Sequence, residues 1–217
     1  MTKIIFIVSA YNEEKNLKKV LLSLKKYGKS LTINDGSIDN TKKIAKKYSD
    51  YYLNNKTNKG YDFTQKKGLK YAVKKLKSFK YAITFDGDGQ HIAREVDKFK
   101  KKLKYSIIIG NRKFFNRPIE KKISFISKKK FDISDPLTGM KMFNIKRLKK
   151  EILKLNFKKN DFGLYFLRWI KDFTHSNVTI NVKKQNKKSS MGESKNVQNE
   201  FYKSFKKVTA EILKVVK

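Results

Sequence analysis

Short apolar runs alternate with amphipathic stretches through the first half of this chain, and that alternation restricts its fold more than any other feature. The first run, residues 3–9, is mostly apolar, as expected for a strand buried on both faces of a sheet. The next stretch has apolar residues at the spacing of one helical face, and Asn12 is its expected N-cap. The pattern predicts strands at 3–9, 30–35, 51–53, 80–85 and 105–112, separated by helices at 12–27, 36–48, 61–77 and 95–103.

Strands that alternate with helices predict an α/β fold with a mostly parallel, doubly wound sheet. In such sheets ligands bind beyond the carboxyl ends of the strands. Polar clusters stand at four of these ends, at residues 9–14, 34–37, 86–90 and 110–112. The sequence therefore predicts a functional site along one edge of the sheet.

The second half of the chain is less regular. We expect a loop with one helix over 113–139, strands at 140–145 and 177–184, helices at 146–155 and 161–173, and a polar loop over 185–196. No internal repeat or linker is visible, so we expect one domain over residues 1–195. An amphipathic helix over 196–217 is its expected C-terminal appendage.

The composition excludes several classes of protein. The formal charge is +35, but only five of the 54 basic residues are arginine, and lysines cover nearly every predicted helix. This pattern indicates a generally lysine-rich composition more than a surface dedicated to binding a polyanion. No nucleic acid is therefore expected as a partner. The chain has no cysteine and no apolar run of the roughly 20 residues that span a bilayer. The first apolar run is too short for a signal peptide, and we expect a cytoplasmic protein, peripheral on the cytoplasmic membrane face.

Asp86, Asp88 and Gln90 follow the fourth predicted strand in the sequence FDGDGQH. Alternating oxygen ligands suit a hard divalent cation such as Mg²⁺ or Mn²⁺, which completes its shell with water and phosphate. A calcium-binding EF-hand loop is disfavoured because His91 and Asp97 stand where that loop needs glycine and glutamate. A glycine-rich turn with incidental acids is the simpler alternative.

Asp35 ends the second predicted strand, where a carboxylate can accept hydrogen bonds from a ribose or a base. A plain Asp-Gly turn explains it equally well. Neither a Walker P-loop nor a G-x-G-x-x-G motif follows a strand, which disfavours P-loop NTPases and dehydrogenases.

Seven fragments in order carry a resemblance to a known family: IVSAYNEEKNL, INDGSIDNT, NKG with the later Gly68, FDGDGQH, GNR, SDPLTGMKMF and GESK. Together, over residues 4 to about 195, the chain resembles family 2 glycosyltransferases of GT-A fold, and most of all the dolichyl- or polyprenyl-phosphate sugar synthases. The chain departs from the family pattern at Ser9, where the family has proline, and at Ser189, where it has arginine.

The resemblance implies an inverting transfer of a sugar from a UDP- or GDP-sugar, with Mg²⁺ or Mn²⁺ as cofactor. The catalytic residues it implies are Asp86, Asp88 and Asp135, and the metal ligands are Asp88 and Gln90. The nucleotide-sugar site it implies is Ala10, Tyr11, Glu13, Asp35, Gly60, Asp86 and Gly87. The residues it implies for acceptor or phosphate binding are Arg112, Arg117, Lys141, Ser194 and Lys195.

The acceptor that the resemblance implies is a polyprenyl (dolichyl-type) phosphate, and a sugar hydroxyl is the alternative. A polyprenyl phosphate is already anionic and needs no base. A sugar hydroxyl of a glycolipid or surface polysaccharide needs a carboxylate, and Asp135 is the candidate, although it can equally be a turn cap before Pro136. From other classes, a basic nucleic-acid-binding protein and a non-catalytic nucleotide-sugar-binding protein remain alternatives.

The C-terminal segment carries one apolar stripe, at Phe201, Phe205, Val208, Ile212 and Val215, with lysines around it. This pattern is typical of an interfacial membrane helix, and we consider membrane contact through residues 199–217. It is also typical of a helix that docks on its own domain or on a second subunit.

Overall fold

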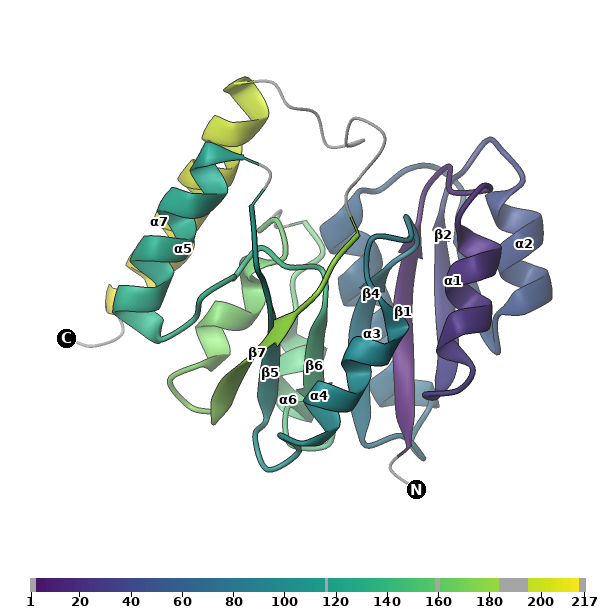
Figure 1. The fold of residues 1–217 in the computed structure, drawn as a ribbon, viewed down its shortest axis with the longest axis horizontal. Helices are drawn as coiled ribbons and strands as arrows, with labels where there is room; N and C mark the ends of the chain where they lie inside the picture. Colours follow the sequence, from purple (N-terminus) through teal and green to yellow (C-terminus); the bar gives the residue numbers. More distant parts are fainter. Residues whose placement is uncertain (1–2, 116, 159–160, 184–194, 215–217) are drawn as a thin grey trace.

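A seven-stranded sheet runs through the computed structural model, which describes residues 3–115, 117–158, 161–183 and 195–214 (Figure 1). Its strand order is β3-β2-β1-β4-β6-β5-β7, and every neighbouring pair is parallel except the two pairs that β6 makes. The mostly parallel sheet predicted from the sequence is therefore confirmed. The strands are β1 (Ile4–Ala10), β2 (Lys29–Asp35), β3 (Tyr51–Asn55), β4 (Tyr81–Asp86), β5 (Ile107–Arg112), β6 (Lys141–Asn144) and β7 (His175–Ile180).

Helices cover both faces of the sheet and bury one apolar cluster on each side. One cluster involves α1 (Leu17–Leu24), α2 (Thr41–Tyr48), η1 (Ala93–Glu95) and α4 (Val96–Lys100). The other involves α3 (Tyr61–Lys75), α5 (Pro118–Phe131), α6 (Lys149–Lys154), η2 (Leu164–Trp169) and α7 (Lys195–Lys214). Helices α5 and α7 lie side by side at one end of the molecule (Figure 1).

The alternation of side chains along the strands explains this two-sided core. In β1, Ile5 and Ile7 belong to one cluster, while Phe6 and Val8 belong to the other. A strand covered on both faces needs apolar residues at every position, as the sequence indicated. The helix positions expected to be buried in α1 and α3 are buried.

The N-cap prediction for Asn12 is wrong. Helix α1 begins at Leu17, and Asn12 has a left-handed backbone with φ 54°. The backbone N–H of Asn12 donates to Ser37 Oγ (3.0 Å), and its Oδ1 accepts from the N–H of Ile38 (3.0 Å). These bonds to the loop after β2 replace the capping bond, because asparagine side chains also stabilise turns.

The predicted helix at 161–173 is also different in the structure. A 3₁₀ helix, η2, covers Leu164–Trp169 after a left-handed turn at Gly163 (φ 76°). Its aromatic residues Tyr165, Phe166 and Trp169 are buried. The packing of these large side chains favours the 3₁₀ conformation here, although the local sequence favours an α-helix.

The apolar stripe of α7 faces the protein over its described part. Phe201, Phe205 and Val208 are buried, and α7 contacts η2 and α5. The side chain of Ile212 and the whole of Val215 lie outside the described residues. Of the three arrangements considered for this segment (membrane, own domain and second subunit), the described side chains adopt the one docked on the domain. No helix in the described ranges is long and apolar enough to cross a membrane.

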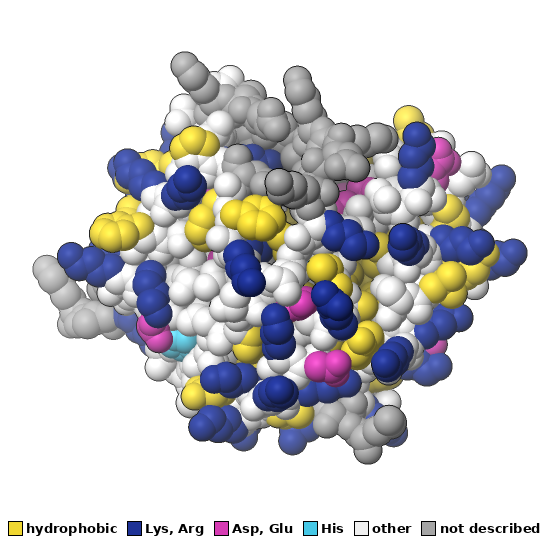
Figure 2. Space-filling model, viewed as in Figure 1, with side chains coloured by type: hydrophobic (Ala, Val, Ile, Leu, Met, Phe, Trp, Pro, Cys, Tyr) yellow, Lys and Arg dark blue, Asp and Glu magenta, His cyan; other side chains and the backbone are white. Residues whose placement is uncertain are grey.

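Lysine and arginine side chains are scattered over the face drawn in Figure 2, with few acidic side chains between them. They do not gather into one stripe on this face. That distribution agrees with a general lysine background.

Candidate active site

The site lies at the edge of the sheet where β1, β2 and β4 end. Because these strands are parallel neighbours, their carboxyl ends meet, and Ser9 stands opposite Asp86 in the register of β1 and β4. Strand β6 runs the other way, so its first residue reaches this edge: Lys141 pairs with Thr84. The antiparallel β6 thus adds a cation to a group of strand-end carboxylates.

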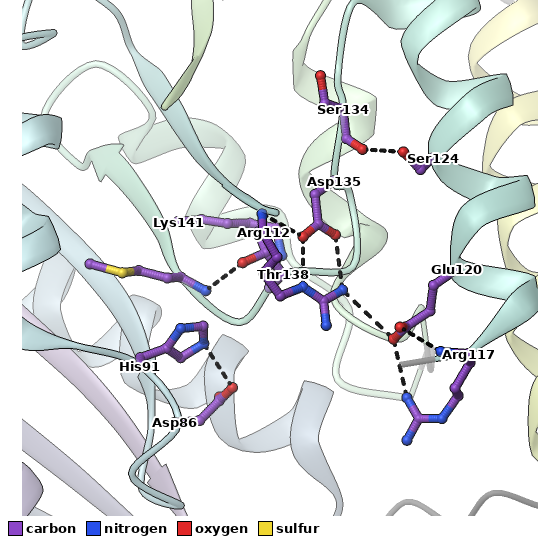
Figure 3. A network of polar contacts seen from close by, with 11 residues as sticks. Asp86, His91, Arg112, Arg117, Glu120, Ser124, Ser134, Asp135, Thr138 and Lys141 are labelled. Carbon is purple, nitrogen blue, oxygen red and sulfur yellow. Dashed lines mark hydrogen bonds and ion pairs between the residues drawn. The ribbon is translucent and has the colours of Figure 1, made fainter. Parts of the chain in front are cut away.

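Asp86 is held beside His91, with 3.3 Å between Asp86 Oδ2 and His91 Nε2 (Figure 3). Gly139 approaches this pair from the loop before β6. A Cβ at Gly139 would lie 2.0 Å from Asp86 Oδ2, so only glycine fits there. The other carboxylate oxygen, Asp86 Oδ1, is buried without a hydrogen-bond partner, as is His91 Nδ1.

The two carboxylates of this motif have opposite pKa shifts. For Asp86, burial is outweighed by the hydrogen bond and charge of His91, helped by Lys141, and its pKa falls below the usual value. For Asp88, burial and the charge of Asp86 raise the pKa to about 6, despite a hydrogen bond from the N–H of Gln90 (2.9 Å). The charge of His91 also acts on Asp88 but does not outweigh burial and the charge of Asp86.

These features fit a divalent cation. The unpartnered Asp86 Oδ1 and the raised pKa of Asp88 both indicate a place for added positive charge. Within the described ranges there is no group of three or more acidic, histidine or cysteine side chains that would hold a metal by itself. Two carboxylates with water and a diphosphate are the usual environment of Mg²⁺ or Mn²⁺.

Asp35 lies at the end of β2 and organises the loop that starts α3. Its Oδ1 accepts from Asn55 Nδ2 (2.7 Å) and from the N–H of Lys59 (2.9 Å), and its Oδ2 accepts from the N–H of Gly60 (2.9 Å). Gly60 has φ 87°, a conformation that favours glycine. Asp35 and Gly60, both expected in the nucleotide site, are thus brought into direct contact.

The remaining nucleotide-site candidates follow β1 and β4. Ala10 is buried at the end of β1, and Tyr11 is exposed just beyond it. The N–H of Glu13 donates to Thr41 Oγ1 (2.7 Å). The N–H of Gly87 donates to Ser9 O (3.0 Å), which ties the two strand ends together.

Arg112 and Asp135 form a bidentate ion pair (Figure 3). Arg112 Nε lies 2.6 Å from Asp135 Oδ2, and its NH2 lies 3.0 Å from Oδ1. Asp135 is fully buried. Although burial opposes it, the charge and hydrogen bonds of Asp135 raise the pKa of Arg112.

Glu120 extends this pair into a network. Its Oε1 lies 3.6 Å from Arg112 NH2 and 3.2 Å from Arg117 NH1. Arg117 caps α5, and its Nε is buried without a hydrogen-bond partner. This N–H donor therefore has no hydrogen-bond partner among the described residues.

Lys141 is almost completely buried, and its Nζ donates to Thr138 O (Figure 3). Burial lowers the pKa of Lys141 to about 8, opposed by the charges of Asp135 and Asp86. Of the other expected phosphate-binding positions, Ser194 lies outside the described residues, as does Ser189. Lys195 begins α7, and its side chain is not described.

Three residues of this site were missed by reasoning from the sequence: Tyr61, Glu120 and Gly139. Burial and the charge of Asp86 raise the pKa of Tyr61 well above its usual value, which places its phenol near that carboxylate. Glu120 could have been noticed as the N3 acid of a helix that begins with Pro118. Tyr61 and Gly139 carry no local signal, because their role depends on contacts with β4.

The sequence matches the model of Glycosyl transferase family 2 over residues 5–174. The chain belongs to this family. Among curated relatives, it is 30% identical over 180 residues to UDP-N-acetylglucosamine–dolichyl-phosphate N-acetylglucosaminyltransferase of Methanococcus voltae. This match covers 67% of this chain and 71% of that protein. An uncharacterised protein of Methanocaldococcus jannaschii is 37% identical over 130 residues, covering 55% of this chain and 56% of that protein, so the match spans little more than half of its length.

Solved glycosyltransferase structures share the fold. Glucosyl-3-phosphoglycerate synthase from Mycobacterium tuberculosis, in complex with Mn²⁺, UDP and phosphoglyceric acid, has a TM-score of 0.66 at 13% identity, covering 98% of this chain and 78% of that one. TarS from S. aureus in complex with UDP-GlcNAc has a TM-score of 0.64 at 18% identity, covering 98% and 67%. The GT-A fold expected from the sequence is confirmed.

Proposed function

We propose that the protein transfers a sugar from a nucleotide-diphosphate sugar to a polyprenyl phosphate, with inversion at the anomeric carbon. The observation that carries this proposal is the pairing of Arg112 with Asp135. Both oxygens of the buried Asp135 carboxylate are engaged by one guanidinium, which opposes its use as a base. A phosphate acceptor needs no base, whereas a sugar hydroxyl does.

On the donor side, Asp35 and Gly60 would hold the base and ribose, together with Ala10, Tyr11 and Glu13. Asp86 and Gly87 would lie against the ribose or the sugar. Asp88 and Gln90 would hold Mg²⁺ or Mn²⁺, which supplies Lewis-acid stabilisation of the leaving diphosphate. The unpartnered Asp86 Oδ1 and the raised pKa of Asp88 support a cation at this place.

On the acceptor side, the free Nε of Arg117 and the ammonium of Lys141 would meet phosphate oxygens. Ser194 and Lys195 are further candidates from the sequence. In the transfer step, a phosphate oxygen of the acceptor forms a bond to the anomeric carbon as the bond from that carbon to the diphosphate oxygen breaks. The nucleoside diphosphate leaves with the electron pair, and no proton has to move.

The relative from Methanococcus voltae supports a dolichyl-type phosphate as acceptor and UDP-N-acetylglucosamine as the first donor to test. Such an acceptor is embedded in a lipid bilayer, so we propose a cytoplasmic protein that binds the cytoplasmic membrane face peripherally. The exposed lysines of α7, such as Lys203, Lys206 and Lys207, would contact anionic lipid. Its buried apolar stripe would remain docked on the domain.

The deciding experiment is a transfer assay with UDP-N-acetylglucosamine, GDP-mannose and UDP-glucose, each with Mn²⁺ and dolichyl phosphate in detergent. Label should enter the organic phase as an acid-labile lipid product. A parallel assay offers a glycolipid with free hydroxyls and no phosphate. Transfer to the hydroxyl acceptor alone would overturn the proposal in favour of the second chemistry.

A further inference from the structure

A cluster of five charged side chains, three of them buried and two partly exposed, lies behind the candidate active site, and the proposed reaction does not use it. The cluster joins α3, the segment 161–163, η2 and α7. Its members are Asp62, Lys66, Asp161, Arg168 and Glu211.

Asp161 stands at the centre of this cluster. Arg168 donates to both of its oxygens, from NH2 to Oδ1 (3.0 Å) and from NH1 to Oδ2 (3.2 Å). Lys66 Nζ lies 3.4 Å from the same Oδ2, and both Asp161 and Lys66 are almost completely buried. Buried charges are tolerated only in a well-paired geometry, so this cluster fixes one arrangement of the segments that carry it.

Towards the active site, the cluster holds the backbone of 161–163. Asp62 accepts from the N–H of Asp161 (2.5 Å) and from the N–H of Gly163 (2.8 Å). A Cβ at Gly163 would lie 3.5 Å from Tyr61 Cε1 and 3.7 Å from Lys141 Nζ. The segment therefore forms a wall against Tyr61 and Lys141, two residues that interact electrostatically with Asp86.

Away from the active site, the cluster reaches the C-terminal helix. Arg168 Nε donates to Glu211 Oε2 of α7 (2.8 Å), so one guanidinium is shared between Asp161 and Glu211. Phe205 and Val208 of α7 pack in the same apolar cluster as η2. The position of Arg168 thus depends on α7 being docked.

We propose that Arg168 is a positioning residue for the transfer reaction and that α7, through Glu211, completes the active site. Arg168 holds the wall at 161–163 in register with Tyr61 and Lys141, and Glu211 holds Arg168. The proposal rests on the proposed function because it assigns Lys141 to the reacting phosphates. The nucleotide base would bind at Asp35, two strands away from Asp86, so donor affinity should depend little on Arg168.

The test compares Arg168→Met, Arg168→Lys and Glu211→Gln with the unmodified protein. We expect kcat to fall about tenfold or more in Arg168→Met and less in the other two, since small displacements of reacting groups are costly. The KM for the nucleotide sugar should stay within about twofold. Trp169, the single tryptophan of the chain, is buried next to Arg168, and its emission reports whether η2 stays packed.

Glu200→Gln is the matched control, because Glu200 is an exposed residue of the same helix that pairs only along the surface with Lys203 (3.2 Å). It should leave kcat unchanged. Unchanged kcat in folded Arg168→Lys and Glu211→Gln would overturn the proposal, as would a donor KM that rises in step with the loss of kcat. Nucleotide release from the donor without lipid is measured in parallel. If the unmodified protein releases nucleotide but labels no lipid phosphate, the proposed acceptor fails while the comparison of variants stands.

Discussion

Arg112 occupies both carboxylate oxygens of Asp135, and its own backbone N–H also donates to Asp135 Oδ2 (3.2 Å). The acid that the family resemblance offered as a base is therefore bound three times by one residue. This relationship makes the role of Asp135 testable by substitution.

Asp135→Asn should lower the stability of the protein without abolishing the transfer reaction. The buried guanidinium of Arg112 would lose its main counter-charge, and the free energy of unfolding should fall by about 3 kcal/mol. Transfer to a lipid phosphate should persist, with an unaltered pH profile of kcat, at temperatures where the variant is folded. Asp132→Asn is the control, because Asp132 is an exposed acid in a surface pair with Lys128. A loss of about a thousandfold with a changed pH profile would instead assign Asp135 as a base.

Asp88→Asn should stabilise the protein when no divalent cation is present. The folded state raises the pKa of Asp88 from 3.8 to about 6, so it favours the protonated form. The resulting cost appears as pH rises from about 4 to about 6 and persists above it, and the amide should relieve about 1–2 kcal/mol at pH 7. Urea unfolding with EDTA measures this gain.

With Mn²⁺ and UDP present, the unmodified protein should become more stable than Asp88→Asn. The two ligands should raise the melting temperature of the unmodified protein and not that of Asp88→Asn, because ligands stabilise the state they bind. Asp97→Asn, at an exposed acid of α4, serves as the control and should respond like the unmodified protein. Equal metal-dependent shifts in both variants would remove Asp88 from the metal site.

Gly139→Ala should displace Asp86 from His91. The added Cβ would stand 2.0 Å from Asp86 Oδ2 and 2.8 Å from His91 Nε2. The chain has two histidines, so the imidazole signals of His91 can be followed by NMR, and they should shift. Gly60→Ala is the control, because it strains the backbone at a positive φ but its Cβ would meet nothing within 4 Å. The His91 signals should stay in place in this variant.

Lys141→Met should remove an increase in the free energy of unfolding that the unmodified protein shows as pH rises above about 8. The folded state lowers the pKa of Lys141 from 10.5 to about 8, so the unfolded state binds more protons between those values. The unmodified protein should therefore gain up to about 2–3 kcal/mol relative to the variant as pH rises from about 8 to about 10.5. Urea unfolding across this range measures the difference. A constant gap between the two proteins would show that Lys141 is not strained by burial.

Much of this fold could be predicted from the sequence, because apolar periodicity is a local property. The run at 3–9 and the spacing Leu17–Val20–Leu21–Leu24 determine a strand and a helix without reference to other segments. The placement of Asp35 and Asp86 at one edge followed from the parallel sheet.

The relations between distant segments could not be predicted in the same way. Nothing in the local pattern around Lys141 indicates that β6 runs antiparallel to β4, or that Arg112 meets Asp135 from 23 positions away. Asn12 was misplaced because its partners, Ser37 and Ile38, lie in another loop. In each of these cases the partner of the side chain lies far along the chain.

The register between β6 and β4 also determines which side chain of β6 lies at the site. Lys141 stands between Met140 and Met142, which are both buried in the cluster on the opposite face of the sheet. A slip of one residue would turn the ammonium into that cluster and bring a thioether to the rim. A chain that buries Met140 and Met142 in this cluster therefore also places Lys141 at the edge of the sheet where Asp86 lies.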